Sequence, residues 1–183
     1  ALIGLAMTVF LDMLGFSLFF PDLQLRFKDL AAAALHVPAD SPNTQLGLLI
    51  GFAIALYSLA QFLVAPIMGR LSDAQGRRTV LRWSCALTLV SYLIYAHAHS
   101  YEYVLLSRLV GGLGAANIGV AFAYVADVTT PEDRGKGMGL VGASLGMGFV
   151  LGPPLGVLLL SLAHNSPLLL DYVAAVLTAV NLA

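Results

Sequence analysis

Three charged residues lie inside long apolar stretches of this sequence, namely Asp12, Arg108 and Asp171. A charge at that depth in a bilayer costs several kcal/mol and persists only when it is paired or faces water. A nearby guanidinium favours the ionised form of a carboxyl group, whereas burial favours the neutral form. These residue types can therefore bind and release a proton within a membrane, with Asp12 as the titrating group and Arg108 as the group that tunes it.

A second charged group lies between two apolar stretches, in the run Gly69-Arg70-Leu71-Ser72-Asp73-Ala74-Gln75-Gly76-Arg77-Arg78. In this run Gly76 suits a positive φ, and Asp73 is expected to cap the helix that follows. The simplest interpretation is that the arginines only hold the connection on one side of a membrane.

A functional interpretation of this connection involves residues further along the chain. Asp73 and Arg77 are expected to form a charge cluster with Asp127, and Arg134 lies within reach of that cluster. Exposed ion pairs contribute only about 0–1 kcal/mol each. The cluster would therefore act as a cytoplasmic gate that biases a conformational equilibrium as it forms and breaks.

The composition predicts that membrane helices position these groups. Of the 183 residues, 59% are hydrophobic and 10% are charged, whereas soluble domains carry about 25% charged residues. The net charge of −1, with basic residues confined to short connections, gives no sign of a nucleic-acid partner. The single cysteine, Cys85, lies in an apolar stretch, so neither a disulfide framework, a metal site nor another cofactor is expected.

Six apolar stretches are long and continuous enough to be membrane helices, although the last is slightly short for a span. Strands of a membrane barrel would instead be about ten residues long with alternating polarity. Both ends of the chain look trimmed, so residues 1–183 are expected to form one domain of a longer protein. The stretches are Ala1 to Phe20, Leu46 to Met68, Thr79 to Ala96, Tyr103 to Val125, Gly137 to Leu160 and Leu168 to Ala183.

The basic residues predict the orientation in the membrane. Arg26 and Lys28 lie in the long connection after the first stretch, which is expected to contain a short surface helix near Ala31 to Leu35. Because cytoplasmic connections are enriched in lysine and arginine, the other end of the bundle and the N-terminus are expected in the cytoplasm, in a bacterial inner membrane. That end carries Arg70, Arg77, Arg78, Arg82, Arg134 and Lys136.

The depths of the intramembrane charges are similar. Asp12 lies about eight residues, roughly 12 Å, from the outer end of its helix, and Arg108 lies about five residues, roughly 7.5 Å, from the outer end of its own. We expect them to share one cavity in the outer half, although Arg108 has the alternative of extending to the outer surface. Asp171 is expected at the membrane interface, near the outer end of the last helix.

Small and polar residues mark the fourth and fifth stretches. Gly111, Ala115 and Gly119, spaced by four, allow close approach of another helix. Asn117 nearby makes either an interhelical hydrogen bond or a contact with a substrate cavity, and Gln61 on the second stretch is another candidate for that cavity. In the fifth stretch, glycines form a stripe without side chains, and a proline pair within it bends the helix. These residues are Gly148, Gly152, Pro153, Pro154 and Gly156.

Taken together, these motifs resemble the N-terminal half of a major facilitator superfamily transporter, in the drug:proton antiporter branch that includes tetracycline-efflux proteins. The loop matches the signature loop of that superfamily at every defining position. The run Arg108 to Ala116 resembles the motif of its helix 4, and Gly148 to Gly156 resembles the antiporter motif of its helix 5, with Val157 where the family has a final glycine. Leu11 to Phe16, followed by Pro21, resembles the helix 1 motif.

The resemblance implies a twelve-helix protein made of two six-helix halves, each with a 3+3 inverted repeat, and a substrate site between the halves near mid-membrane. In that family the helix 4 arginine is associated with proton coupling. Helices 1, 2, 4 and 5 would face the C-terminal half, and the glycine stripe of helix 5 would serve as a hinge where the halves meet.

The leading functional hypothesis is proton-coupled export of small amphipathic compounds by alternating access, with the lipid bilayer, the substrate and protons as partners. An importer or facilitator of a metabolite on the same fold is the first alternative. A non-transporting membrane sensor or scaffold is a second. A membrane enzyme is disfavoured, because no histidine lies inside an apolar stretch and no serine has a buried base nearby.

Overall fold

The computed structural model of the chain describes residues 2–22, 26–39, 44–115, 117–162 and 168–182. Every regular element within these ranges is a helix. The helices are α1 (Leu2–Ser17), α2 (Phe19–Asp22), α3 (Lys28–Leu35), α4 (Thr44–Gln75), α5 (Arg77–Ala96), α6 (Tyr101–Gly114), α7 (Asn117–Val128), α8 (Arg134–Leu162) and α9 (Leu168–Leu182).

The all-helical fold predicted from the apolar stretches is confirmed. The first stretch forms α1 and α2, the fourth forms α6 and α7, and the others form α4, α5, α8 and α9 in turn. Within the described residues, α4, α5, the α6–α7 stretch and α8 are long and apolar enough to cross a membrane. The apolar helices α1 and α9 are shorter, at 16 and 15 residues. The end of the last predicted stretch, Ala183, lies outside the described residues.

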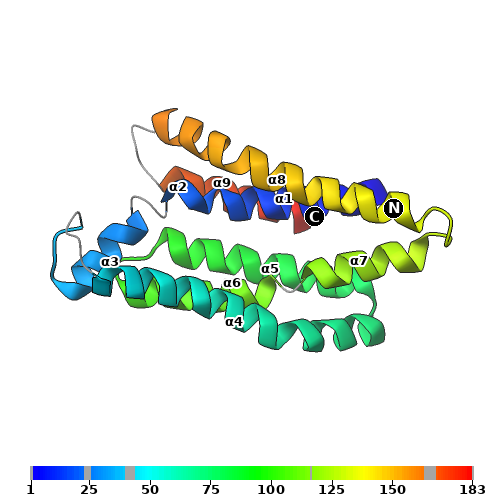
Figure 1. Cartoon of the computed structure of the whole chain (residues 1–183), viewed down its shortest axis with the longest axis horizontal. Coiled ribbons are helices and arrows are strands. Elements are labelled where there is room, and N and C mark those ends of the chain that lie inside the picture. Colours follow the sequence, from blue (N-terminus) through cyan, green and yellow to red (C-terminus); the bar gives the residue numbers. More distant parts are fainter. Residues whose placement is uncertain (1, 23–25, 40–43, 116, 163–167, 183) are drawn as a thin grey trace.

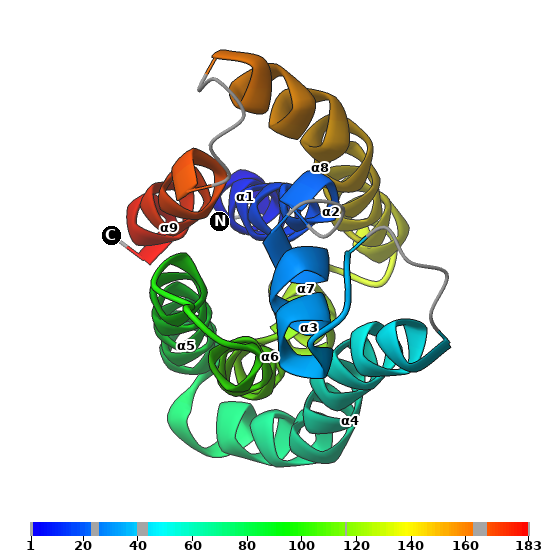
Figure 2. The same ribbon diagram turned by 90° about the vertical axis from the view of Figure 1, so that its left-hand side faces the viewer.

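The helices form one elongated bundle (Figure 1). The α4–α5 and α7–α8 connections, which carry the basic residues, lie at one end, and α3 lies at the other. Figure 2 shows the bundle from the α3 end, with α1, α8 and α9 on one side and α4, α5 and α6 on the other. Helix α1 packs on α8 and α9, and α6 packs on both α4 and α5.

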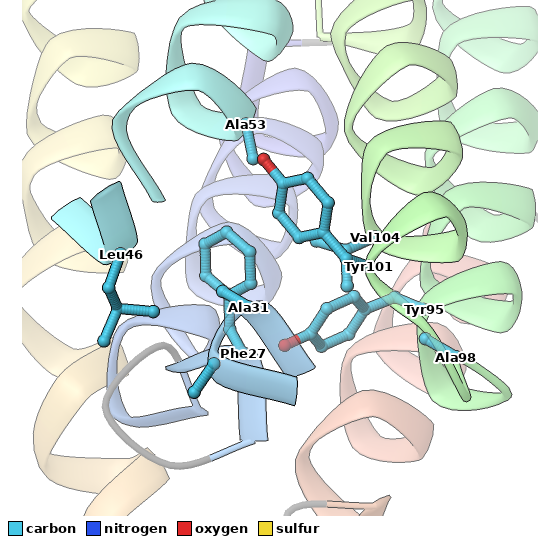
Figure 3. Packing of buried hydrophobic residues seen from close by; sticks show 9 residues of the cluster. Phe27, Ala31, Leu46, Ala53, Tyr95, Ala98, Tyr101 and Val104 are labelled. Carbon is cyan, nitrogen blue, oxygen red and sulfur yellow. The ribbon is translucent and has the colours of Figure 1, made fainter. Parts of the chain in front are cut away.

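The short helix expected in the long connection is present as α3, at one end of the bundle (Figure 1). Phe27 and Ala31 are fully buried there against residues of α4, α5 and α6 (Figure 3). The rings of Phe27 and Tyr101 stack with centroids 6.5 Å apart, and the Tyr101 hydroxyl donates to the Leu49 carbonyl at 2.6 Å. These contacts tie α3 to α4 and α6, so the end of the bundle that holds the buried charges is capped.

The loop with three arginines is tighter than the sequence predicts. Helix α4 continues to Gln75 and α5 begins at Arg77, which leaves Gly76 with a φ of 92° as the residue between them. A positive φ is available to glycine without steric cost, so the prediction for Gly76 is confirmed. The predicted capping role of Asp73 is wrong, because α5 has no side-chain cap and Asp73 lies in the last turns of α4.

Glycines of α6 allow its close approach to two neighbours, and the predicted register is confirmed at Gly111, where a Cβ would lie 2.6 Å from the Ser91 hydroxyl. A Cβ at Gly112 would overlap the backbone carbonyl of Tyr57, and one at Gly114 would lie 2.8 Å from the Thr88 hydroxyl. Gly119, in contrast, faces open space. Spacing alone predicted one glycine stripe, whereas α6 lies between α4 and α5 and needs small residues on two faces.

The glycine stripe of α8 faces α1. A Cβ at Gly148 would lie 2.7 Å from Cβ of Met13, and one at Gly152 would overlap the side chain of Ser17. The close packing expected from the small residues is therefore present within this half, and the hinge stays a prediction. Helix α8 also remains continuous through Pro153 and Pro154.

Candidate functional site

The Asp12 carboxylate lies buried in the bundle, with 6% of the residue exposed. Its partner is Asn117, the first residue of α7, whose Nδ2 donates to Asp12 Oδ2 over 2.9 Å. Of the two alternatives for Asn117, the structure thus shows an interhelical hydrogen bond. The bond joins the first apolar stretch to the fourth.

Polar side chains from neighbouring helices satisfy the end of α6. Gln61 Nε2 on α4 donates to the Ala115 carbonyl over 3.0 Å, and Ser84 on α5 donates to the Gly114 carbonyl. The last carbonyls of a helix have no intrahelical partner, so these bonds stabilise the junction between α6 and α7. Gln61 also lines a groove of about 300 Å³ between α4 and α7, with Ala65, Gly69, Ala115, Ile118, Gly119 and Val120.

Arg108 lies inside the bundle and does not extend to its outer surface, since only 4% of the residue is exposed. Its guanidinium carbon lies 5.2 Å from the ring centroid of Tyr95 on α5 and 5.9 Å from that of Tyr57 on α4. Aromatic faces attract a guanidinium strongly when both are shielded from water. The two tyrosines therefore hold the charge inside the bundle.

Asp12 and Arg108 face the same interior but contact different groups. Asp12 accepts from Asn117, whereas Arg108 packs on aromatic rings. Tyr57 and Tyr92 interact electrostatically with both charged groups. Asp12 and Arg108 are thus both buried, the first on Asn117 and the second on the rings of Tyr57 and Tyr95.

Asp171 takes part in a buried ion pair that the sequence analysis missed. Arg26 Nη1 lies 2.7 Å from Asp171 Oδ2, and the side chains are 15% and 6% exposed. Arg26 also donates to the Ala96 and Ala98 carbonyls over 2.9 and 2.8 Å. The sequence contained a signal for this pair. Arg26 is one of two basic residues in the long connection after the first stretch, and an acidic residue near the end of the last apolar stretch needs a cation.

A second charge cluster lies at the basic end of the bundle. Arg77 pairs with Asp73 at 2.5 Å and with Asp127 at 2.9 Å, and it donates to the Ser72 hydroxyl over 2.6 Å. These bonds bring together α4, α5 and α7, as the sequence predicts for a gate. Arg134 donates instead to the Ala126 carbonyl over 3.3 Å, next to Asp127.

The other residues predicted for the gate lie around this cluster. Arg78 donates to the Tyr124 hydroxyl over 3.0 Å, and the Ser72 hydroxyl donates to the Gly69 carbonyl over 2.7 Å. Among the described residues, no group of three or more His, Cys, Asp or Glu side chains is placed to hold a metal ion.

Several known proteins are similar in sequence to this chain. The class C tetracycline resistance protein of Escherichia coli is 40% identical over 182 residues, which cover 100% of this chain and 43% of that protein. Major facilitator superfamily domain-containing protein 10 of Bos taurus is 40% identical over 136 residues, which cover 73% and 29%. The quinolone resistance protein NorA of Staphylococcus aureus is 30% identical over 161 residues, which cover 87% and 38%.

A solved structure has the same arrangement of helices. The crystal structure of the human organic anion transporter MFSD10 (TETRAN) matches 99% of this chain and 45% of that chain, with a TM-score of 0.79 and 29% identity. The chain thus spans less than half the length of these relatives.

The profile of the Major Facilitator Superfamily matches residues 5–183, a range that includes Asp12, Arg108 and the charge cluster around Arg77. These relatives are transport and drug-resistance proteins, and the family is one of transporters and not of enzymes. The chain is therefore a member of the major facilitator superfamily.

Proposed function

We propose that the chain is the N-terminal six-helix half of a transporter that exports small amphipathic compounds in exchange for protons. The observation that carries this proposal is the burial of both Asp12 and Arg108 inside the bundle, where Asp12 has a hydrogen-bonding partner and Arg108 has aromatic partners. A carboxyl group and a guanidinium retained inside a membrane bundle are typical of proton relays. The drug-resistance names of two relatives support export.

The proposed coupling uses the distance between these two groups. When Arg108 approaches Asp12, its positive charge favours the carboxylate and expels a proton. When Arg108 withdraws toward Tyr95, the buried carboxyl group favours its neutral form and takes a proton. Substrate bound near Gln61 and Asn117 would bias this movement and so exchange with the proton.

The uncovered faces of the bundle support a partner domain. Only 11% of the most apolar 18-residue window of α4 is buried in this half, and 22% of that of α8. In a twelve-helix protein the C-terminal half and lipid would cover these faces. The α4 residues concerned are Leu48, Phe52, Ile54, Leu59, Phe62, Leu63 and Ile67.

The orientation of the bundle is part of the same proposal. The basic residues of the α4–α5 and α7–α8 connections share one end of the bundle (Figure 1). The excess of arginine and lysine in cytoplasmic connections favours a cytoplasmic location for this end and for the N-terminus. The Arg77 cluster would then act as the cytoplasmic gate, in a bacterial inner membrane.

The test is transport by the protein from its complete reading frame, reconstituted in vesicles with an imposed pH gradient. We expect Asp12→Asn and Arg108→Ala to abolish uphill transport while downhill exchange continues. Matched controls are Asp29→Asn on α3 and Arg82→Ala on α5, both exposed, which should keep coupling. Unchanged coupling in both test variants would refute the proposal, and net accumulation in whole cells would favour the importer.

A second candidate substrate class is organic anions. The structural relative is named as an organic anion transporter, and the buried guanidinium of Arg108 is a group that binds carboxylates or sulfonates. If anions are the cargo, Arg108→Lys should weaken transport of an organic anion and spare that of an organic cation. A comparison of the two fluxes in the same vesicles distinguishes the classes.

A further inference from the structure

A small cavity of about 10 Å³ lies between α1, α5 and α9. All the residues that line it are buried, so it lies inside the bundle. Two of them leave room for it because they are small, namely Gly15 on α1 and Ala174 on α9. One buried water occupies about 10–15 Å³ of such a cavity and needs polar partners. The volume therefore suits a single water molecule.

The hydroxyl end of Tyr92 on α5 faces this cavity. Gly15 lines the cavity, and a Cβ built on Gly15 would lie 3.3 Å from the Tyr92 hydroxyl oxygen. Tyr92 is 8% exposed, and in the part of the chain that the structure describes its hydroxyl makes no hydrogen bond. Because a buried hydroxyl without a partner is costly, this group needs an acceptor at the cavity.

The second polar group of the cavity wall is the carboxylate of Asp171 on α9. The residue is 5% exposed, and its Oδ2 accepts a hydrogen bond from Arg26 Nη1 over 2.7 Å. Among the residues that the structure describes, Oδ1 has no such donor. A carboxylate accepts several hydrogen bonds, so Asp171 can accept more than the one from Arg26. The wall thus contains one group that donates and one that accepts.

We propose that this cavity binds one water molecule, which accepts a hydrogen bond from the Tyr92 hydroxyl and donates one to Asp171 Oδ1. Two groups of matching chemistry line a space that one water fills, and this juxtaposition supports the site. The water links the Arg26–Asp171 pair to α5 and gives both buried polar groups a partner. The site does not depend on the proposed transport.

The test is radiolytic labelling of the complete protein with X-rays, in which hydroxyl radicals formed from a bound water modify the side chains beside it. We expect Tyr92 to be labelled although it is buried. Gly15→Ala should slow this labelling several-fold, because the added methyl group takes up the space of the water. The matched control is Gly4→Ala on the same helix, where a Cβ meets open space. No labelling of Tyr92 in the unchanged protein, or the same rate in Gly15→Ala, would overturn the inference.

A second variant tests the same site if Gly15→Ala does not fold. Tyr92→Phe keeps the ring and removes the donor, so the water loses one of its two partners. We expect the labelling of Leu170, which also lines the cavity and is 1% exposed, to fall several-fold. Tyr172→Phe, at an exposed position next to Asp171, should leave that rate unchanged. Equal rates at Leu170 in the two variants would show that Tyr92 holds no water.

A density map of the complete protein at a resolution that shows waters checks the site directly. We expect a peak within hydrogen-bond distance of both the Tyr92 hydroxyl and Asp171 Oδ1. A cavity without a peak in such a map would contradict the proposed site.

Discussion

The ion pairs at the two ends of the bundle have similar geometry and different surroundings. Arg26 and Asp171 lie 2.7 Å apart with side chains 15% and 6% exposed. At the basic end, Arg77 lies 2.5 Å from Asp73 and 2.9 Å from Asp127, whose side chains are 64% and 52% exposed. Because distances are comparable, burial decides how much each contact stabilises the protein.

This difference indicates that the ion pairs at the two ends contribute differently to stability. Breaking one partner of a buried pair leaves an uncompensated charge and costs about 3–5 kcal/mol, whereas an exposed pair contributes about 0–1 kcal/mol. The Arg77 cluster is therefore weak enough to open in the proposed transport cycle. The Arg26–Asp171 pair is the stronger contact and links α9 to the chain just before α3.

The largest expected effect comes from breaking the buried pair. Arg26→Met should lower the free energy of unfolding by about 3–5 kcal/mol, because it leaves the Asp171 carboxylate buried without its cation. Thermal unfolding of the purified complete protein measures this. Adding Asp171→Leu to the variant should recover most of the loss. If Arg26→Met lowers the free energy of unfolding by less than about 1 kcal/mol, this pair contributes no more than an exposed ion pair, and the comparison is wrong.

The hydrogen bond to Asp12 should have an intermediate effect. Asn117→Leu removes the donor to a buried carboxylate and should cost about 1–3 kcal/mol. The same unfolding assay measures it, with Ile118→Leu as a control at the neighbouring, partly exposed position. An unchanged stability of Asn117→Leu would mean that the bond contributes nothing to the folded state.

The exposed cluster should contribute least to stability. Asp127→Asn should change the free energy of unfolding by no more than about 1 kcal/mol. Asp133→Asn, which breaks the exposed Lys136–Asp133 pair of 2.8 Å, is the matched control and should behave alike. A loss of about 3 kcal/mol in Asp127→Asn would contradict the comparison and assign the cluster a structural role.

The smallest expected effect is that of ionic strength on the stability deficits of the variants at the two ends. At 1 M ionic strength the screening length is about 3 Å, so exposed pairs weaken while buried pairs are screened much less. The stability difference between Asp127→Asn and the unchanged protein should therefore vanish at high salt, whereas the deficit of Arg26→Met should persist. Equal salt sensitivity at both ends would refute the distinction.

Sequence alone determined the helical fold, the family resemblance and the identity of the intramembrane charges. Apolar length and loop arginines are local properties, so the six stretches and the conformation of Gly76 could be predicted. Position along a helix also gave the depths of Asp12 and Arg108. Depth does not say which neighbour a side chain meets, because the rotation of each helix and its packing partners depend on the whole bundle.

Tertiary structure therefore decided the partners. It assigned Asn117 to Asp12, Arg26 to Asp171 and the tyrosine rings to Arg108. It also turned the glycine stripe of α8 toward α1, where spacing alone permitted any neighbour. The physical reason is that the sequence shows that a buried charge needs a partner and that a glycine face needs a closely packed neighbour. Which residue meets that need depends on helices that are distant in sequence.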